Sequence, residues 1–334
     1  MDLQCRIESF VNETGPSPST KCMKTEHGVC TFDLERDALS TFRVFTVNEE
    51  DADLETLEEA AKLAAFYNAK FFHELVQTER CNLKIARLAT TLKKGQVSAY
   101  AIVDHSQSTV RMAELGMDEL TQVAEQLANL HSILVDEDVR TTINDNHAVV
   151  WEQKLSRIER SIDMGCAAVE GELRPYFTHP ESIREKLKSL HPNPLSITGR
   201  LSVICHGNLT NERCSFNDKG RLIEMTGWEN VHTGHPIEDL ASLIIIRHYF
   251  YTLVDMRAPH LMLADLRVAF KQSIGAVVLA SFDGLIDSLA CPVFNHEAKK
   301  IITRRWESAL DDAYDVAHGD SLSDNEQSFF KSSD

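Results

Sequence analysis

The feature that most constrains this 334-residue chain is a compact β block surrounded by helical sequence. Residues 201–205 are a short apolar run typical of a buried strand, and 206–208 lead out of it into a loop. An Asn-Asp-Lys-Gly turn at 217–220 reverses the chain into a second strand, 221–228. The segment 234–241 then begins an apolar helix. Residues 201–243 are therefore the segment on which a functional interpretation of this chain depends.

The sequence before this block predicts a small sheet with one long helix. Residues 41–47 have the β-branched and aromatic content of a strand. Apolar residues then recur at helical spacing over 52–77, after an N-cap at Asn48. Two strand-like runs, 83–92 and 96–103, are separated by Lys-Lys-Gly, which is typical of a hairpin.

The rest of the chain is mainly helical. Helices are predicted from near 118 to 134 and over 151–172, 181–190, 238–256, 262–290 and 296–317. The sequence therefore predicts an α+β, two-lobed fold. Its parts are a loosely ordered segment 1–30, a small strand-rich N-lobe 31–104, a larger helical C-lobe 105–317, and a disordered acidic tail 318–334.

Charge and targeting signals limit the partners and the compartment. The 34 basic residues against 51 acidic ones give a net charge of −17, so we expect neither a nucleic-acid nor an anionic-membrane surface. No secretory signal precedes the fold, and the apolar stretch near 276–280 is too short to span a bilayer. The eight cysteines form no Cys-x-x-Cys pair, so we expect reduced thiols without a structural zinc site. These expectations place the protein in the cytoplasm.

The landmarks of 201–243 resemble the aminoglycoside phosphotransferase and choline kinase superfamily, and most of all its CHK kinase-like or ecdysteroid kinase-like branch. In that family a strand ends in His-Gly-Asp, an Asn follows in the loop, and a second strand ends in Ile-Asp-Trp or Ile-Asp-Phe. A Gly-x-Pro-x-x-Asp-Leu-Ala helix start comes next. The counterparts here are 206–208, Arg213, 226–228 and 234–241. The resemblance implies a two-lobed protein kinase-like fold.

Three positions that the resemblance makes functional carry other residues here. The family's base falls on Asn208, whose neutral amide cannot accept a proton. Its loop metal ligand falls on Arg213, a fixed cation that repels Mg²⁺. Its strand-end metal ligand falls on Gly227, which has no side chain. The resemblance is therefore to a degenerate member, for which we expect no catalytic residue, no metal site and no cofactor.

The first lobe departs from the family in the same direction. The family's phosphate-binding Lys falls on Phe45 and its partner Glu near Ala69. A slip of one residue would bring Lys70, and a slip of two would bring Arg43, to these positions. Guanidinium groups match phosphate oxygens, so Arg213 and Arg43 are the candidate nucleotide-binding residues.

The scaffold of the loop is retained. His206 and Asp239 correspond to the pair that braces the catalytic loop from beneath in this superfamily. Keeping this brace while losing the acids is what a fold retained without its chemistry should look like. Polar residues close to the altered positions could restore activity only if base, metal ligands and phosphate loop were all replaced; they are Asn211, Asp218, Glu224 and Glu229.

Two functions follow from the resemblance. The first is a catalytically inactive, kinase-like protein that binds a protein partner or a small hydroxylated ligand. The alternative is a phosphotransferase that acts on an alcohol group, with ATP and Mg²⁺ as cofactors and non-standard catalytic residues. The identity of the ligand cannot be read from the sequence.

Overall fold

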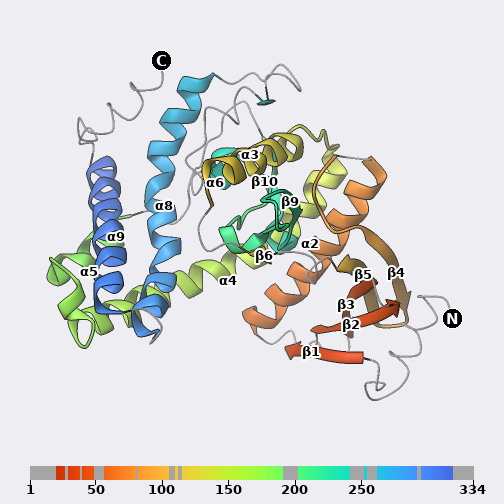
Figure 1. Ribbon diagram of the computed structural model, residues 1–334, viewed down its shortest axis with the longest axis horizontal. Coiled ribbons are helices and arrows are strands. Elements are labelled where there is room, and N and C mark those ends of the chain that lie inside the picture. The colour runs from red at the N-terminus through yellow and green to blue at the C-terminus, as the bar shows by residue number, and fades with distance from the viewer. Residues whose placement is uncertain are drawn as a thin grey trace. The chain divides into compact units, whose positions relative to one another are not determined.

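The computed structural model describes residues 20–26, 29–37, 40–48, 56–79, 82–104, 110–111, 115–190, 202–240, 252–253, 262–291 and 295–318. The fold is α+β, as the sequence predicts, with a sheet near the N-terminus and mainly helices after it (Figure 1). The chain forms two compact units, one from Met1–Gln153 and Leu201–His260 and the other from Lys154–Arg200 and Leu261–Asp334. This partition differs from a lobe boundary at residue 104, because the β block groups with the N-terminal sheet. Residues 1–19 and the predicted tail 319–334 lie outside the described residues.

The sheet of the first unit has five antiparallel strands in the order β1-β2-β3-β5-β4. β3 (Ser40–Asn48) contains the predicted strand 41–47, and β4 (Leu88–Lys94) with β5 (Val97–Asp104) forms the predicted hairpin. The strands β1 (Thr20–Glu26) and β2 (Val29–Asp37) run into the segment 1–30, which the sequence predicts to be loosely ordered. That expectation is wrong for residues 20–26 and 29–30. Strand formation in the polar run of β1 depends on its pairing with β2.

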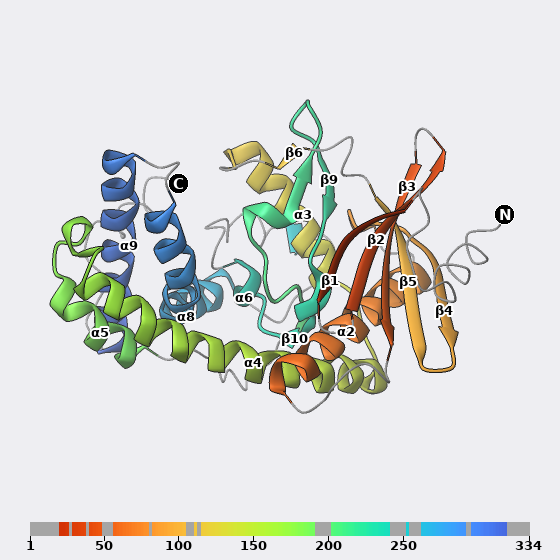
Figure 2. The same cartoon turned by 90° about the horizontal axis from the view of Figure 1, so that it is seen from below.

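The long helix α2 (Leu57–Glu79) lies alongside this sheet (Figure 2). The rings of Phe66 and His73 lie 5.3 Å and 5.9 Å from the Tyr100 ring of β5, measured between centroids. The helix begins after Thr56, whose hydroxyl oxygen accepts the N–H of Glu59 at 3.3 Å. Thr56, and not the predicted Asn48, therefore caps this helix.

The β block forms two small sheets in the same unit. β10 (His232–Gly234) pairs with β7 (Val203–Cys205), and β6 (Val110–Arg111), β8 (Cys214–Phe216) and β9 (Leu222–Met225) form a second sheet. Two 3₁₀ turns, η3 (Asn211–Arg213) and η4 (Trp228–Asn230), and the short helix α6 (Ile237–Leu240) complete it. Gln122 of α3 (Met117–His131) holds the hairpin, because its amide bonds both Gly220 and Leu222 at 2.9 Å. The sequence predicts β7, the hairpin and α3, but it does not predict β10.

The second unit is a helical bundle. It comprises the C-terminal half of α4 (Glu137–Glu170), α5 (Pro180–Ser189), α8 (Leu263–Ala290) and α9 (His296–Ala317), of which α8 and α9 lie side by side in both views. The predicted helices 181–190, 262–290 and 296–317 are confirmed. α4 begins well before its predicted start at 151, after Asp136, whose carboxylate accepts the N–H of Val139 at 2.8 Å.

The apolar part of α8 is longer than the stretch near 276–280 that was predicted to be too short to span a bilayer. Ser273–Ala290 of α8 is long and apolar enough to cross a membrane by length and composition. Its Val278, Phe282 and Leu289 are buried in the core of the second unit, where the Phe282 ring stacks on Trp306 of α9 at 5.2 Å. In this fold the stretch is therefore the core helix of a bundle.

Candidate functional site

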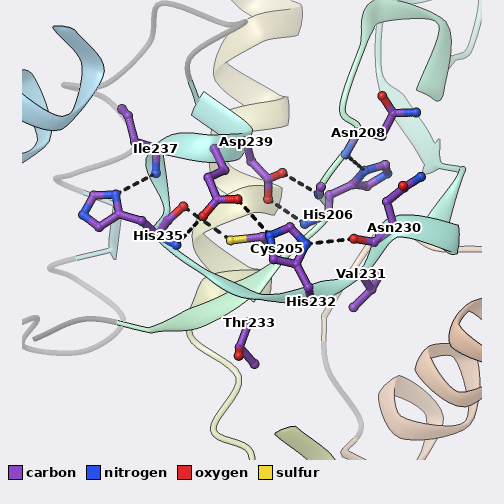
Figure 3. Close-up of polar contacts among 12 residues, drawn as sticks. Cys205, His206, Asn208, Asn230, Val231, His232, Thr233, His235, Ile237 and Asp239 are labelled. Carbon is purple, nitrogen blue, oxygen red and sulfur yellow. Dashed lines mark hydrogen bonds and ion pairs between the residues drawn. The ribbon is translucent and has the colours of Figure 1, made fainter. Parts of the chain in front are cut away.

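Asp239 lies at the centre of the contacts that support the loop after β7 (Figure 3). Its side chain is buried, and its two oxygens accept the N–H groups of His206 at 2.7 Å and Gly207 at 2.9 Å. The Nε2 atom of His131 lies 3.1 Å from the same carboxylate. Burial alone would raise the pKa of Asp239, but His131 and the hydrogen-bonded loop outweigh it and hold this pKa below its usual value. The ionised carboxylate therefore holds the loop.

The buried His206 ring joins the two loops of the site. Its Nδ1 accepts the N–H of Asn208 at 3.3 Å, and its Nε2 donates to the carbonyl oxygen of Thr226 at 2.9 Å. Burial lowers the pKa of His206, and the Arg213 guanidinium lowers it further, so the ring is neutral with its proton on Nε2. The structure thus brings together His206 and Asp239, the two residues that the sequence assigns to the brace.

Trp228 and Asn68 position the end of the second strand. The Trp228 ring lies 4.5 Å from the rings of both Phe72 and His206. The Asn68 side chain of α2 donates to the carbonyl oxygen of Val231 at 2.6 Å. α2 is therefore anchored directly to the site. Asn68 was not predicted from the sequence, and neither was the role of His131. The signal for His131 is that a polar residue stands at a helical position where an apolar one is expected.

Arg213 and Gly227 lie against each other. Gly227 has φ 88° and ψ 47°, a left-handed conformation that favours glycine. A Cβ atom built on Gly227 would lie 2.7 Å from Cδ and Nη1 of Arg213. The N–H of Thr226 also donates to the carbonyl oxygen of Arg213 at 2.8 Å. The guanidinium thus takes the space of a side chain at position 227, and it pairs with no carboxylate among the residues that the structure describes.

The predicted residues of the first lobe lie on the sheet and on α2. Arg43 is half-buried on β3, where Asp33 of β2 and Ile102 of β5 are its register partners. Lys70 forms an ion pair with Glu74 at 2.9 Å within α2, so a local partner already occupies its ammonium group.

Glu229 is the acid at this site that has an unused oxygen. Its Oε2 atom is buried and has no hydrogen-bond partner in the described part of the chain. Burial raises the pKa of Tyr100 well above its usual value, and the charge of Glu229 raises it further. At the three altered positions, however, the chain offers an amide, a guanidinium and a bare backbone. That set contains a cation suited to an anion and contains no carboxylate, so the amide oxygen of Asn208 is the one side-chain group among the three that could contact a metal.

No protein-family model matches this sequence, and no curated protein does. Several solved structures have a similar backbone fold. One is a ternary complex of APH(2″)-IIa with streptomycin and ATP, which is 14% identical to this chain with a TM-score of 0.48. The match covers 95% of this chain and 99% of that one. Another is the macrolide 2′-phosphotransferase MphH from Brachybacterium faecium, at 12% identity, a TM-score of 0.48, and coverage of 93% and 98%. A third is spectinomycin phosphotransferase APH(9)-Ia with ADP and spectinomycin, at 10% identity, a TM-score of 0.48, and coverage of 95% and 98%. These identities and TM-scores do not assign the chain to a family.

Proposed function

We propose that this chain is a kinase-like protein of the aminoglycoside phosphotransferase and choline kinase superfamily, in its CHK kinase-like branch. It has lost phosphoryl transfer and acts by binding a small hydroxylated ligand or a protein partner. The observation that carries this proposal is the Arg213 guanidinium packed against the open side of Gly227. Positions 213 and 227 correspond to the two that hold Mg²⁺ in the family that the sequence resembles. Here the Arg213 guanidinium, a fixed cation, occupies the space at both positions.

The absence of a base supports the same conclusion. Phosphoryl transfer needs a group that orients the attacking hydroxyl and a metal that neutralises the polyphosphate. Asn208 follows the braced His206-Gly207 turn, where the family has its Asp, and an amide cannot take the hydroxyl proton. The brace on Asp239 therefore supports a loop without the chemistry that it supports in relatives.

The fixed cation suggests how a phosphate-bearing ligand binds. A guanidinium forms paired hydrogen bonds with phosphate oxygens, and it needs no metal to do so. We propose that Arg213 binds the phosphate of a nucleotide in place of Mg²⁺, with Arg43 on β3 as the second candidate contact. Arg213 forms no ion pair with a carboxylate among the described residues, so none of these residues competes with the phosphate for its guanidinium.

Metal-independent nucleotide binding is the expected result of a thermal unfolding experiment. ATP should raise the melting temperature equally with Mg²⁺ and with a chelator, and a hundredfold excess over Kd should add about 2.7 kcal/mol to the free energy of unfolding. Arg213→Ala should abolish the shift. Arg221→Ala, an exposed arginine of the hairpin, is the matched control and should keep it.

Two outcomes of that experiment would change the proposal. A shift that requires Mg²⁺ would contradict it, as would conversion of ATP to ADP that Asn208→Ala abolishes. If ATP shifts the melting temperature under neither condition, the protein does not bind the nucleotide. The ligand would then be a protein partner or a small hydroxylated molecule without a nucleotide.

The alternative is an active phosphotransferase, and the unpartnered oxygen of Glu229 is the observation that favours it. A carboxylate at this place could serve as a base or a metal ligand. In that case the purified protein should turn over ATP with a hydroxylated acceptor, and Glu229→Gln should lower the rate by at least about 100-fold, the lower range for general-base catalysis. If wild type and Glu229→Gln both release no ADP, the alternative is wrong.

A further inference from the structure

Three metal-binding atoms lie together beneath the loop, from residues to which the proposed function gives no role. Cys205 and His232 face each other directly across the antiparallel pair of β7 and β10, and Glu238 lies in α6 (Figure 3 labels the first two). The Sγ of Cys205, a ring nitrogen of His232 and a carboxylate oxygen of Glu238 all lie within 4.8 Å of one another. We propose that these three side chains form a zinc-binding site.

The hydrogen bonds around His232 are those of a metal ligand. Its Nδ1 donates to the carbonyl oxygen of Asn230 at 2.9 Å, which fixes the ring and directs Nε2 at Glu238, whose Oε2 lies 2.8 Å away. Metal-binding histidines characteristically donate their second ring N–H to a backbone carbonyl in this way. The other oxygen of Glu238, Oε1, accepts the N–H of His235 at 2.8 Å, so Oε2 is the one that is directed at the ion.

The cluster is closely packed but has a route of entry from solvent. Gly234 lies against it, and a Cβ atom there would meet the Glu238 carboxylate and come within 3.0 Å of Nε2 of His232. The side chains of His232 and Glu238 are 10% and 17% exposed, whereas Cys205 is fully buried. An ion would therefore enter past His232 and Glu238, and water would occupy its remaining position.

The donor set selects zinc over the magnesium of a kinase. Zinc binds thiolate, imidazole and carboxylate together at about 2.0–2.3 Å, whereas Mg²⁺ requires oxygen ligands. The ion would replace two protons. One is the thiol proton of Cys205, whose Sγ lies 3.4 Å from the carbonyl oxygen of His235, and the other is shared by His232 and Glu238. Both protons are released to solvent, so zinc affinity should fall as the pH falls.

A neighbouring set is less suited to a metal. His131, Cys205 and Asp239 also lie within 4.8 Å of one another. Both oxygens of Asp239, however, already accept the N–H groups of His206 and Gly207. A metal there would have to compete with the brace, and the set of Cys205, His232 and Glu238 leaves the brace intact.

Cobalt is the probe for this site, because it replaces zinc at such ligands and its bond to a thiolate absorbs light. The full chain, freed of metal with a chelator, should bind one Co²⁺ with thiolate-to-cobalt absorption, and one equivalent of Zn²⁺ should displace it. Cys205→Ser should lose this absorption. Cys214→Ser, which removes another fully buried thiol from the β block, is the matched control and should keep it. Glu238→Gln should keep the absorption but weaken cobalt binding by more than about 10-fold, the loss typical of even an outer partner of a metal site.

The result that would overturn the proposal is the absence of thiolate-to-cobalt absorption in the wild type, or absorption that survives Cys205→Ser. Circular dichroism checks that each variant is folded. If Cys205→Ser does not fold, Glu238→Gln decides, and an unchanged cobalt affinity in that variant would show that the three residues form only a hydrogen-bonded cluster. No step of this test uses phosphoryl transfer or nucleotide binding, so it stands apart from the proposed function.

Discussion

Replacing Asp239 by alanine is expected to lower the free energy of unfolding by about 3–5 kcal/mol, the loss typical of breaking a buried ionic contact. The carboxylate is only 1% exposed and accepts the N–H groups of His206 and Gly207, with His131 at 3.1 Å. Alanine would leave these buried donors without an acceptor. Urea unfolding followed by tryptophan fluorescence measures the loss, since Trp228 contacts the braced histidine.

The pH dependence of the same site separates charge from shape. The pKa of Asp239 is lowered in the folded state, so its charge contributes stability that is fully present above about pH 5 and is lost as the pH falls through the folded pKa. Asp239→Asn keeps the shape and removes the charge. The stability difference between wild type and Asp239→Asn should therefore be constant above about pH 5 and shrink in acid.

A control on the exposed hairpin turn shows whether the effect belongs to the brace. Asp218→Ala should change the free energy of unfolding by no more than about 0.5 kcal/mol, as is usual for surface positions. If Asp239→Ala costs no more than Asp218→Ala, the carboxylate does not hold the loop.

Gly227→Ala is expected to lower the free energy of unfolding by about 1.5–3.5 kcal/mol, for two reasons. The backbone at φ 88° is strained for any residue with a Cβ atom, at about 1–2 kcal/mol. The new methyl group would also lie 2.7 Å from Cδ and Nη1 of Arg213, so this flexible side chain must shift, at about 0.5–1.5 kcal/mol if a χ angle leaves its rotamer. Equilibrium unfolding in urea again measures the sum.

Two further variants separate these contributions. Gly95→Ala introduces a Cβ atom at φ 61° with nothing within 4 Å, so it should show the backbone strain alone. In an Arg213→Ala background, Gly227→Ala should cost about as little as Gly95→Ala, which gives a coupling between positions 213 and 227 in a double-mutant cycle. Equal costs of Gly227→Ala in both backgrounds would mean that the guanidinium does not occupy this space, and the proposed function would lose its main support.

The parts of the fold that could be predicted are those with a clear local pattern of apolar and polar residues. α8 and α9 follow from helical periodicity and end within a residue of their predicted limits. β1 could not be predicted, because its polar sequence becomes a strand only through pairing with β2. β2 was not predicted either, although its Cys30, Phe32 and Leu34 alternate with polar residues as in a strand. The start of α2 was misplaced for a related reason, since both Asn48 and Thr56 are good caps and only the extent of β3 excludes the first.

The sequence by itself determined the chemistry at the altered positions, because an amide, a guanidinium and a hydrogen atom stay what they are in any fold. It also placed His206 and Asp239 in order along the chain. Only the tertiary structure decided that Arg213 fills the space beside Gly227, and that Cys205 faces His232 next to Glu238. Such contacts join residues from different segments of the chain, and they depend on which strands pair and on how the loops pack against them, which the local pattern of each segment does not specify.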